Sequence, residues 1–252
     1  MSKKRTLTIV LTLLVAVCLL ATTALAAVVP STPSMPSAPS GATVPSTPDD
    51  PTAPIQPSQP SQPSQPSEPE LKFIDVNEGD WFYNSVMWAV KNGVTVGTTP
   101  TTFEPYTACT RAQMIEFLWN AVGKPAATIK SVPFTDVPES GSDDYWYEAS
   151  LLWAYEAGIV AGTNDGSTFS PDQVCTRAEM ISFIARLLAN GATDDMPFVD
   201  VPASAWYYNE VLWAWANGLT VGTNDGTTFS PDNACIRAEA VEFLYNAFAE
   251  VE

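Results

Sequence analysis

The sequence contains no histidine among its 252 residues. This absence excludes catalysis that uses an imidazole as general base, and it removes the commonest protein ligand of zinc. No Gly-x-Ser-x-Gly nucleophile elbow and no convincing metal-ligand spacing takes its place. We therefore expect no catalytic residue, no metal site and no cofactor.

Positive charge is also scarce. The chain has 11 Lys and Arg against 28 Asp and Glu, a formal net charge of −17. Three of the basic residues and none of the acids lie within the segment 1–26, so a chain without that segment carries 8 − 28 = −20. Nucleic acid and anionic membranes are poor partners for such a surface. The acidity favours solubility of an exported protein, or alternatively a cation-binding face.

Cysteine occurs only four times, and one of the four, Cys18, lies within the same segment 1–26. The remaining three, Cys109, Cys175 and Cys235, are an odd number, so they do not form a complete disulfide framework. We interpret them as small buried apolar residues. A metal site made of three cysteines without histidine is the weaker alternative.

The segment 1–26 has the pattern of a secretory signal peptide. Basic residues at 3–5 precede an apolar stretch over about 7–20, and Ala-Leu-Ala stands at 24–26. This pattern predicts cleavage after Ala26 and export of the chain. An uncleaved membrane anchor is disfavoured because the apolar stretch is shorter than the ~20 residues of a spanning helix. A lipid anchor on Cys18 is disfavoured by the bulky Val17 before it.

Residues 27–70 are rich in Pro, Ser and Gln and include the run QPSQPSQPSQPS. Almost nothing in this segment could pack into a core, so the composition predicts a disordered, polyproline-leaning spacer.

From residue 71 onward the chain repeats itself three times, over 71–127, 132–190 and 196–252. Each copy opens with Phe-x-Asp-Val, and the intervals between the opening phenylalanines are nearly equal, at 134 − 73 = 61 and 198 − 134 = 64. A Trp-x6-Trp segment, two glycines four residues apart, a second phenylalanine and an arginine follow in the same order. Such regularity indicates one structural unit copied three times.

Each copy predicts two helices. The first, about ten residues long, follows the first tryptophan and ends at a glycine that serves as C-terminal cap (Gly93, Gly158, Gly218). The second begins at TRAQ or TRAE, where Thr110 with Gln113 and Thr176 with Glu179 form capping boxes. Ile236 replaces the threonine in the third copy, so that helix start lacks this support.

An arginine at the first position of a helix is locally unfavourable, by roughly 0.3–1 kcal/mol, because the helix amino end carries partial positive charge. Something must offset this cost three times. One possibility is internal, with the Asp of Phe-x-Asp-Val paired to the arginine. The other is an external anion bound by helix amides and guanidinium together. If the arginine serves a ligand more than the fold, Arg177→Ala should weaken binding and hardly change the melting temperature.

Residues 71–252 resemble the S-layer homology domain family in the order and spacing of Phe-x-Asp, the tryptophan-rich first helix, the G-x-x-x-G turn and TRAE. The resemblance implies a mainly α fold, with three tandem helix-loop-helix repeats forming a pseudo-threefold body around a central three-helix bundle, and with grooves between neighbours. It also implies noncovalent anchoring of an exported protein to the bacterial cell wall or S-layer. The implied partner is a secondary cell-wall polysaccharide attached to peptidoglycan, often carrying ketal-linked pyruvate.

Carried over to this chain, the resemblance implicates the repeated polar, aromatic and glycine positions in glycan binding. An arginine fork suits a pyruvyl carboxylate, and indole rings suit sugar faces, although one tryptophan in each repeat is expected in the core. The implied ligand-binding residues are Arg111, Arg177, Arg237, Asp75, Asp136, Asp200, Trp81, Trp146, Trp206, Gly97, Gly162 and Gly222.

Three departures from the family pattern distinguish the copies: Gln113 replaces Glu, Ile236 replaces Thr, and the first copy lacks the Asn-Asp-Gly loop. The second copy keeps every element and is expected to contribute most to binding. An enzyme is the rival class, since Asp143–Asp144 or Asp194–Asp195 could serve glycoside cleavage, but adjacent loop acids are usually only solvated. An S-layer subunit or scaffold that binds surface proteins is the other alternative.

Overall fold

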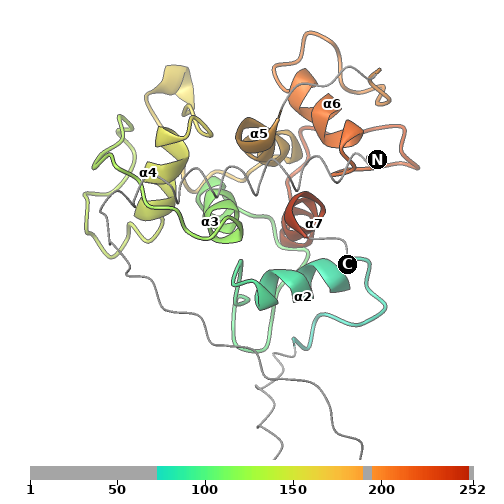
Figure 1. Ribbon diagram of the computed structural model, residues 1–252, viewed down its shortest axis with the longest axis horizontal. Coiled ribbons are helices and arrows are strands. Elements are labelled where there is room, and N and C mark those ends of the chain that lie inside the picture. Colours follow the sequence, from blue (N-terminus) through green and yellow to red (C-terminus); the bar gives the residue numbers. More distant parts are fainter. Residues whose placement is uncertain (1–72, 190–194, 250–252) are drawn as a thin grey trace, which may run out of the picture. The chain divides into compact units, whose positions relative to one another are not determined.

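The computed structural model describes residues 73–189 and 195–249 (Figure 1). The predicted signal peptide (1–26), the spacer (27–70) and Asp194 lie outside these residues. So do residues 71–72, 190 and 250–252 of the predicted repeats, whose exact boundaries stay a prediction.

The described residues form six α-helices, two in each repeat, and no strand beyond isolated β-bridges. This confirms the predicted mainly α class. The first helices of the repeats are α2 (Tyr83–Lys91), α4 (Glu148–Glu156) and α6 (Tyr208–Ala216), and the second helices are α3 (Arg111–Ala121), α5 (Arg177–Leu188) and α7 (Arg237–Phe248). A single 3-10 turn, η1 (Asn164–Gly166), lies in the Asn-Asp-Gly loop of the second repeat.

The first helix of each repeat ends where predicted. Gly93 has φ of +67°, a left-handed conformation that residues with a side chain rarely adopt, and its N–H donates to the carbonyl of Val90. Gly158 and Gly218 repeat this conformation after α4 and α6, with φ of +71° and +76°.

The second helices begin at the predicted caps. The Thr110 hydroxyl accepts from the backbone N–H of Gln113, and the Gln113 side chain accepts in return from the Thr110 N–H, at 3.3 and 3.1 Å. Thr176 and Glu179 form the same reciprocal pair at 3.2 and 2.8 Å. At Ile236 only half of the box remains, because the Ile236 N–H donates to Glu239 but the isoleucine has no acceptor to return.

The helices of different repeats pack in a cyclic order. Each first helix contacts the second helix of the preceding repeat: α4 packs on α3, α6 packs on α5, and α2 packs on α7. The second helices α3, α5 and α7 also contact one another in pairs, so one helix from each repeat lies in the middle, as predicted. A pseudo-threefold symmetry of the whole stays a prediction.

The three cysteines meet through their backbones just before the second helices. The N–H of Cys109 donates to the Cys235 carbonyl, that of Cys175 to the Cys109 carbonyl, and that of Cys235 to the Cys175 carbonyl, at 2.9–3.0 Å. All three side chains are free thiols and fully buried, which confirms the interpretation as small core residues. The sequence did not predict that these equivalent positions would come together.

The buried thiols predict an alkaline limit to stability. Burial raises the pKa of Cys109 from 9.0 to about 12, and burial also raises the pKa of Cys175 and Cys235. Because an unfolded thiol ionises near ~8.5, the unfolded state binds fewer protons above that pH, so the stabilisation present at lower pH is lost as pH rises toward the folded pKa. Urea denaturation is expected to give a free energy of unfolding that falls between about pH 8.5 and 10. Cys109→Ala should make the decline shallower, and an equally steep decline in this variant would contradict the assignment.

Candidate functional site

The aspartate of Phe-x-Asp-Val organises the loop of its own repeat. The carboxylate of Asp136 accepts from the backbone N–H groups of Phe169 and Ser170, at 2.8 and 2.7 Å. Asp75 and Asp200 accept in the same way from the residue pairs at 103–104 and 229–230. The pairing of this aspartate with the arginine, which was one of the two possibilities, is not observed among the described residues, where Arg111 and Arg177 pair with glutamates instead.

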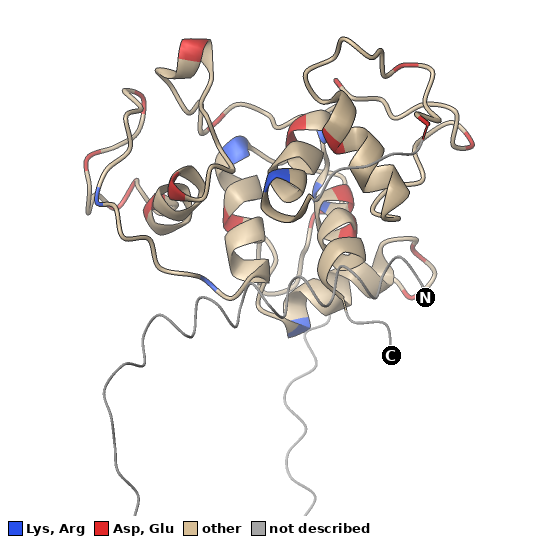
Figure 2. Ribbon diagram, turned by 45° about the horizontal axis from the view of Figure 1, so that its top comes forward, with Lys and Arg blue, Asp and Glu red and all other residues tan. Residues whose placement is uncertain are grey.

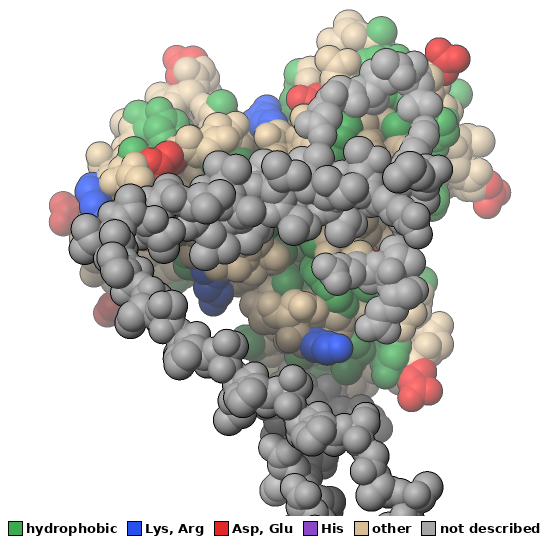
Figure 3. All heavy atoms as spheres, viewed as in Figure 1, with side chains coloured by type: hydrophobic (Ala, Val, Ile, Leu, Met, Phe, Trp, Pro, Cys, Tyr) green, Lys and Arg blue, Asp and Glu red, His purple; other side chains and the backbone are tan. Residues whose placement is uncertain are grey.

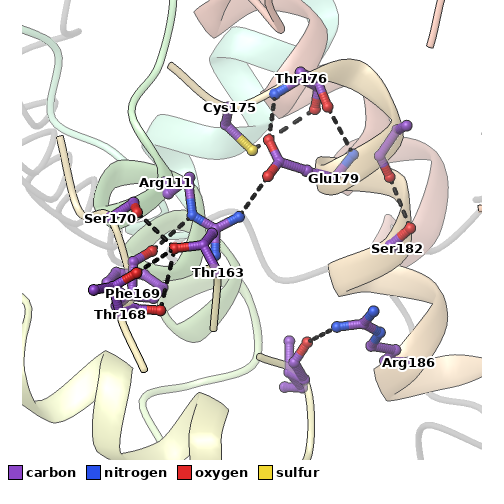
Figure 4. A network of polar contacts seen from close by, with 12 residues as sticks. Arg111, Thr163, Thr168, Phe169, Ser170, Cys175, Thr176, Glu179, Ser182 and Arg186 are labelled. Carbon is purple, nitrogen blue, oxygen red and sulfur yellow. Dashed lines mark hydrogen bonds and ion pairs between the residues drawn. The ribbon is translucent and has the colours of Figure 1, made fainter. Parts of the chain in front are cut away.

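The arginine at the start of the second helix reaches into the following repeat instead (Figure 4). Arg111 donates through Nε to the carbonyl of Phe169 at 2.8 Å and through Nη1 to Glu179 at 2.6 Å. Its guanidinium carbon lies 5.2 Å from the ring centre of Phe169 and 5.5 Å from that of Phe183, and the residue is only 3% exposed. The arginine thus joins two repeats, and the glutamate of TRAE, not the aspartate, offsets its charge.

The second junction repeats this arrangement and the third does not complete it. Arg177 donates to the Phe229 carbonyl and pairs with Glu239 at 2.5 Å. Arg237 donates to the Phe103 carbonyl at 2.7 Å, but the position of the glutamate is held by Gln113. The departure at residue 113 thus removes the carboxylate partner of an arginine at the far end of the sequence.

The two tryptophans of each repeat have different environments. Trp81, Trp146 and Trp206 are 56%, 55% and 58% exposed, and each lies edge-on to the aromatic residue that follows it. The second tryptophans Trp153 and Trp213 are buried, as expected of core residues, whereas Trp88 in the first repeat is only partly buried against the core. The first tryptophans are available to a ligand.

The second glycine of each G-x-x-x-G turn is required by close packing. Gly162 has φ of +84°, and a Cβ there would lie 2.7 Å from the Phe134 ring and 2.7 Å from the carbonyl oxygen of Thr168. Gly97 and Gly222 are in the same situation against Phe73 and Phe198. These glycines bring the turn against the phenylalanine that opens the repeat.

Three of the predicted ligand-binding residues, each from a different repeat, line one pocket of about 190 Å³: Arg111, Gly162 and Trp206. Arg177 and Arg237 lie at the other two junctions. Sequence reasoning missed four polar residues of the wall, which are Thr163, Glu179, Ser182 and Arg186. One signal was visible: nine residues after the TRA arginine, the second repeat has Arg186 where the others have Asn120 and Asn246.

Arg186 is the cation of this pocket that a ligand can reach. It is exposed, and its one hydrogen bond among the described residues joins Nη1 to the Ile159 carbonyl at 2.9 Å. The charge of Arg111 is already balanced by Glu179 in the ion pair. Basic side chains are few and isolated on the described surface, while acids are spread over several loops and helices (Figures 2 and 3). The pocket is therefore lined by the exposed guanidinium of Arg186, with its one hydrogen bond to a backbone carbonyl among the described residues, and by the exposed ring of Trp206.

The fold and the site define a class of protein. It is a small helical module of three interlocked repeats, with a polar pocket that residues of all three repeats line and that the exposed ring of Trp206 borders. The model of the S-layer homology domain matches residues 72–115, 133–181 and 197–241, which is more than half of the chain. The chain belongs to the S-layer homology domain family. Membership supports association with the cell surface or with an S-layer.

Curated relatives share this region. The chain is 34% identical over 93 residues to the surface-layer 125 kDa protein of Lysinibacillus sphaericus, and the match covers 37% of this chain and 8% of that protein. It is 34% identical over 133 residues to a cell surface protein of Thermoanaerobacter kivui, covering 50% and 16%. An endoglucanase of Bacillus sp. (strain KSM-635) is 33% identical over 114 residues, covering 45% and 11%. The chain thus spans a small part of the length of these relatives.

Three further features of the described residues bear on the predictions. None of the helices there has the length and apolar character that crossing a bilayer requires, and no cluster of three or more potential metal ligands is found in the same residues. The loop acids Asp143, Asp144 and Asp195 are exposed, in agreement with their interpretation as solvated side chains.

Proposed function

We propose that the protein is a secreted, non-catalytic anchor that holds its chain at the bacterial cell wall by binding an acidic secondary cell-wall polysaccharide. The observation that carries the proposal is the pocket at the Arg111 junction, which residues of all three repeats line and where Arg186 lies within reach of a ligand near Trp206. A guanidinium binds a carboxylate through two parallel hydrogen bonds, and an indole face packs on the C–H groups of a sugar ring.

In this proposal the buried arginines and the aspartates do not contact the ligand but hold the loop and the wall of the pocket in position. Asp136 fixes the loop, the loop carbonyl and Glu179 fix Arg111, and Arg111 forms a wall of the pocket. Arg186 and Trp206 then make the direct contacts. Ketal-linked pyruvate fits as the acidic group. Its carboxylate would bind Arg186 while the sugar to which it is attached packs on the indole ring of Trp206. Several modest sites in one rigid module gain strength together on a repeating polymer.

The relatives are compatible with an anchor that is joined to different partners. Two are surface proteins and one is an endoglucanase, and each contains much more chain than the matched region. We extend the anchoring role to this chain without glycoside cleavage, because the adjacent loop acids Asp143 and Asp144 are exposed and the pocket is lined by one acid only, Glu179. An S-layer subunit is the second candidate. It is favoured by the surface-layer relative, and ordered sheets assembled by the pure protein would support it over a monomeric anchor.

The anchoring role is tested by sedimentation with purified cell-wall sacculi, before and after the non-peptidoglycan polymer is stripped. We expect the protein to pellet with intact sacculi and to stay in solution with stripped ones. Equal pelleting with both preparations would rule out the polysaccharide as the partner.

The Arg186→Asn variant tests the site itself. Asparagine is what the other two repeats carry here, and the Asn120 and Asn246 amides donate to the Val94 and Leu219 carbonyls, so the fold should tolerate the change. Removing a charged hydrogen bond worth about 1.5–3 kcal/mol should weaken binding to sacculi at least about tenfold. Lys91→Asn, which changes the net charge equally on helix α2, is the matched control and should bind as the parent does. Equal losses in both variants would mean that net charge, not this pocket, governs binding.

A further inference from the structure

A second pocket, of about 250 Å³, lies in the second repeat and shares no residue with the pocket at Arg186. All of its lining residues fall within 130–152, so it is formed by one repeat and the segment before it, not by two neighbouring repeats. Its wall combines apolar, acidic and hydroxyl side chains, among them Phe134, Val137, Leu152, Glu139, Tyr145 and Glu148. The anchoring role proposed above does not use this pocket.

The pocket is particular to the second repeat. Tyr145, directly before the first tryptophan, stands where the other copies have aspartate or alanine. Glu148, two residues after that tryptophan, stands where both other copies have tyrosine. The insertion at 138–144, which is also confined to this repeat, supplies Glu139. Three departures from the repeat pattern thus meet at one pocket, which indicates a site that belongs to the second repeat alone.

The hydroxyl of Tyr145 has no hydrogen-bond partner among the described residues, although the residue is only 6% exposed. A buried phenol usually has such a partner. The hydroxyl is not one of the fully buried unpaired atoms of the described chain, so it reaches open space at the pocket that Tyr145 lines. Burial raises the pKa of Tyr145 to about 12, and the carboxylates of Glu148 and Asp136 add to the rise. The pocket therefore offers a ligand a neutral phenol close to negative charge.

Glu148 is held in position with part of its acceptor capacity unused. One carboxylate oxygen accepts from the Ser140 hydroxyl at 2.5 Å, and the other accepts from the backbone N–H of Gly141 at 3.1 Å. A carboxylate has about four lone-pair positions, so each oxygen can accept one more hydrogen bond. The exposed carboxylate of Glu139 lines the same pocket and has no partner among the described residues.

The charges of the pocket favour a cation. Its wall contains Lys130, Glu139 and Glu148, a formal sum of 1 − 2 = −1, in a chain whose net charge is −17. An anion would face both glutamates, whereas an ammonium group can donate to Glu148 and to the hydroxyl of Tyr145. The apolar part of the wall suits the methylene groups of a side chain that ends in such a charge.

One side of the pocket is formed by a segment whose backbone can pair with a peptide. Residues 130–132 belong to no helix or strand, and their backbone groups make no hydrogen bond within the described part of the chain. Unpaired N–H and C=O groups can bind the main chain of an added extended peptide. A polypeptide that contains lysine supplies both a main chain and an ammonium group on an alkyl stem.

We propose that this pocket binds the lysine side chain of a partner polypeptide. The ammonium group donates to Glu148 and to the hydroxyl of Tyr145, and the methylene groups pack on the apolar side chains of the wall. The partner's main chain pairs with residues 130–132. The site goes beyond the anchoring role, because through it the module binds a protein as well as the wall.

NMR titration of the full chain tests the proposal through the amide of Gly141, which is bonded to Glu148 and reports on the pocket. The probe is the peptide acetyl-Ala-Lys-Ala-amide. The same peptide with norleucine replaces the ammonium by a methyl group, and butylammonium lacks the main chain. At about 20 mM, enough to half-fill a site with Kd of about 20 mM, we expect the lysine peptide to shift the Gly141 signal at least about fivefold more than the norleucine peptide and about twofold more than butylammonium.

Three variants locate the response. Glu148→Gln removes the charge and should reduce the shift caused by the lysine peptide at least about fivefold. Glu210→Gln is the matched control and should respond as the parent does, because Glu210 is also half-buried and lies in the first turn of α6 as Glu148 does in α4. Tyr145→Phe removes a hydroxyl that has no partner among the described residues, so it should keep the melting temperature and still halve the response. Circular dichroism shows whether each variant is folded.

The proposal is overturned if the lysine and norleucine peptides shift Gly141 equally, as when only ordered water fills the pocket. It is also overturned if Glu210→Gln loses as much response as Glu148→Gln, which would mean that the general acidity of the chain attracts the peptide. An equal shift by butylammonium would exclude a polypeptide partner. These outcomes are separate from the anchoring role, because the protein can pellet with sacculi whether or not the Gly141 signal responds.

Discussion

Arg177→Ala should lower the melting temperature of the domain by about 6–20 °C. The substitution leaves Glu239 and the Phe229 carbonyl without their partner and removes a guanidinium packed 4.9 Å from the ring centre of Phe229. Breaking a buried ion pair from one side costs about 3–5 kcal/mol, and each kcal/mol shifts the midpoint of a domain of this size by about 2–4 °C. The measurement is a calorimetric or circular-dichroism melt.

Arg237→Ala is the natural comparison, because Arg237 makes the same bond to a phenylalanine carbonyl but has no glutamate partner. We expect Arg237→Ala to lower the melting temperature by about half as much as Arg177→Ala or less, because Arg237 has no ion pair with a glutamate that the substitution could break. Sequence reasoning alone would allow Arg177 to serve the ligand at little cost to the fold. An unchanged melting temperature together with lost wall binding would mean that Arg177 binds the ligand, and it would contradict the conclusion that this arginine stabilises the contact between two repeats.

Gly162→Ala should destabilise the domain by about 3 kcal/mol or more, close to the effect of breaking the ion pair. The added Cβ would stand 2.7 Å from both the Phe134 ring and the Thr168 carbonyl oxygen, in a left-handed backbone conformation with φ of +84°. The backbone oxygen cannot rotate away as a flexible side chain could. Urea denaturation of the variant gives the loss directly.

Gly158→Ala is the matched control for the backbone conformation alone. Its φ is +71°, but nothing lies within 4 Å of the Cβ that would be added. The cost should be only that of placing alanine in the left-handed region, about 1–2 kcal/mol. Equal losses at residues 158 and 162 would show that conformation, not crowding, makes the second glycine necessary.

The sequence predicted the features that depend on neighbours along the chain. The end of a first helix at Gly93 and the starts of the second helices at Thr110 and Thr176 are confirmed, because each depends on residues within one turn. The exposure of the first tryptophan of each repeat could also be predicted, because helical spacing places the second tryptophan on the face that packs against the core. Local periodicity is sufficient for such predictions.

The polar contacts between repeats could not be predicted from one copy at a time. The partner of Arg111 is Glu179, which belongs to the next repeat, and the equivalent position for Arg237 is Gln113 in the first repeat. The sequence does not single out the hydrogen-bond donors to Asp136. The folded loop shows that they are backbone N–H groups. Arg186 does not follow from the features that the three copies share, because the equivalent residues of the other two repeats are asparagines.

The cyclic packing has a consequence for the order in which the domain can form. Helix α2 packs on α7, which lies two repeats further along the chain, whereas α4 and α6 pack on helices much nearer in the sequence. Contacts between such distant segments form slowly because the intervening chain must first be ordered. Helix α2 is therefore the last to find its partner, and the cyclic packing is completed only after the third repeat has been synthesised. A chain interrupted after two repeats would leave α2 without the surface on which it packs.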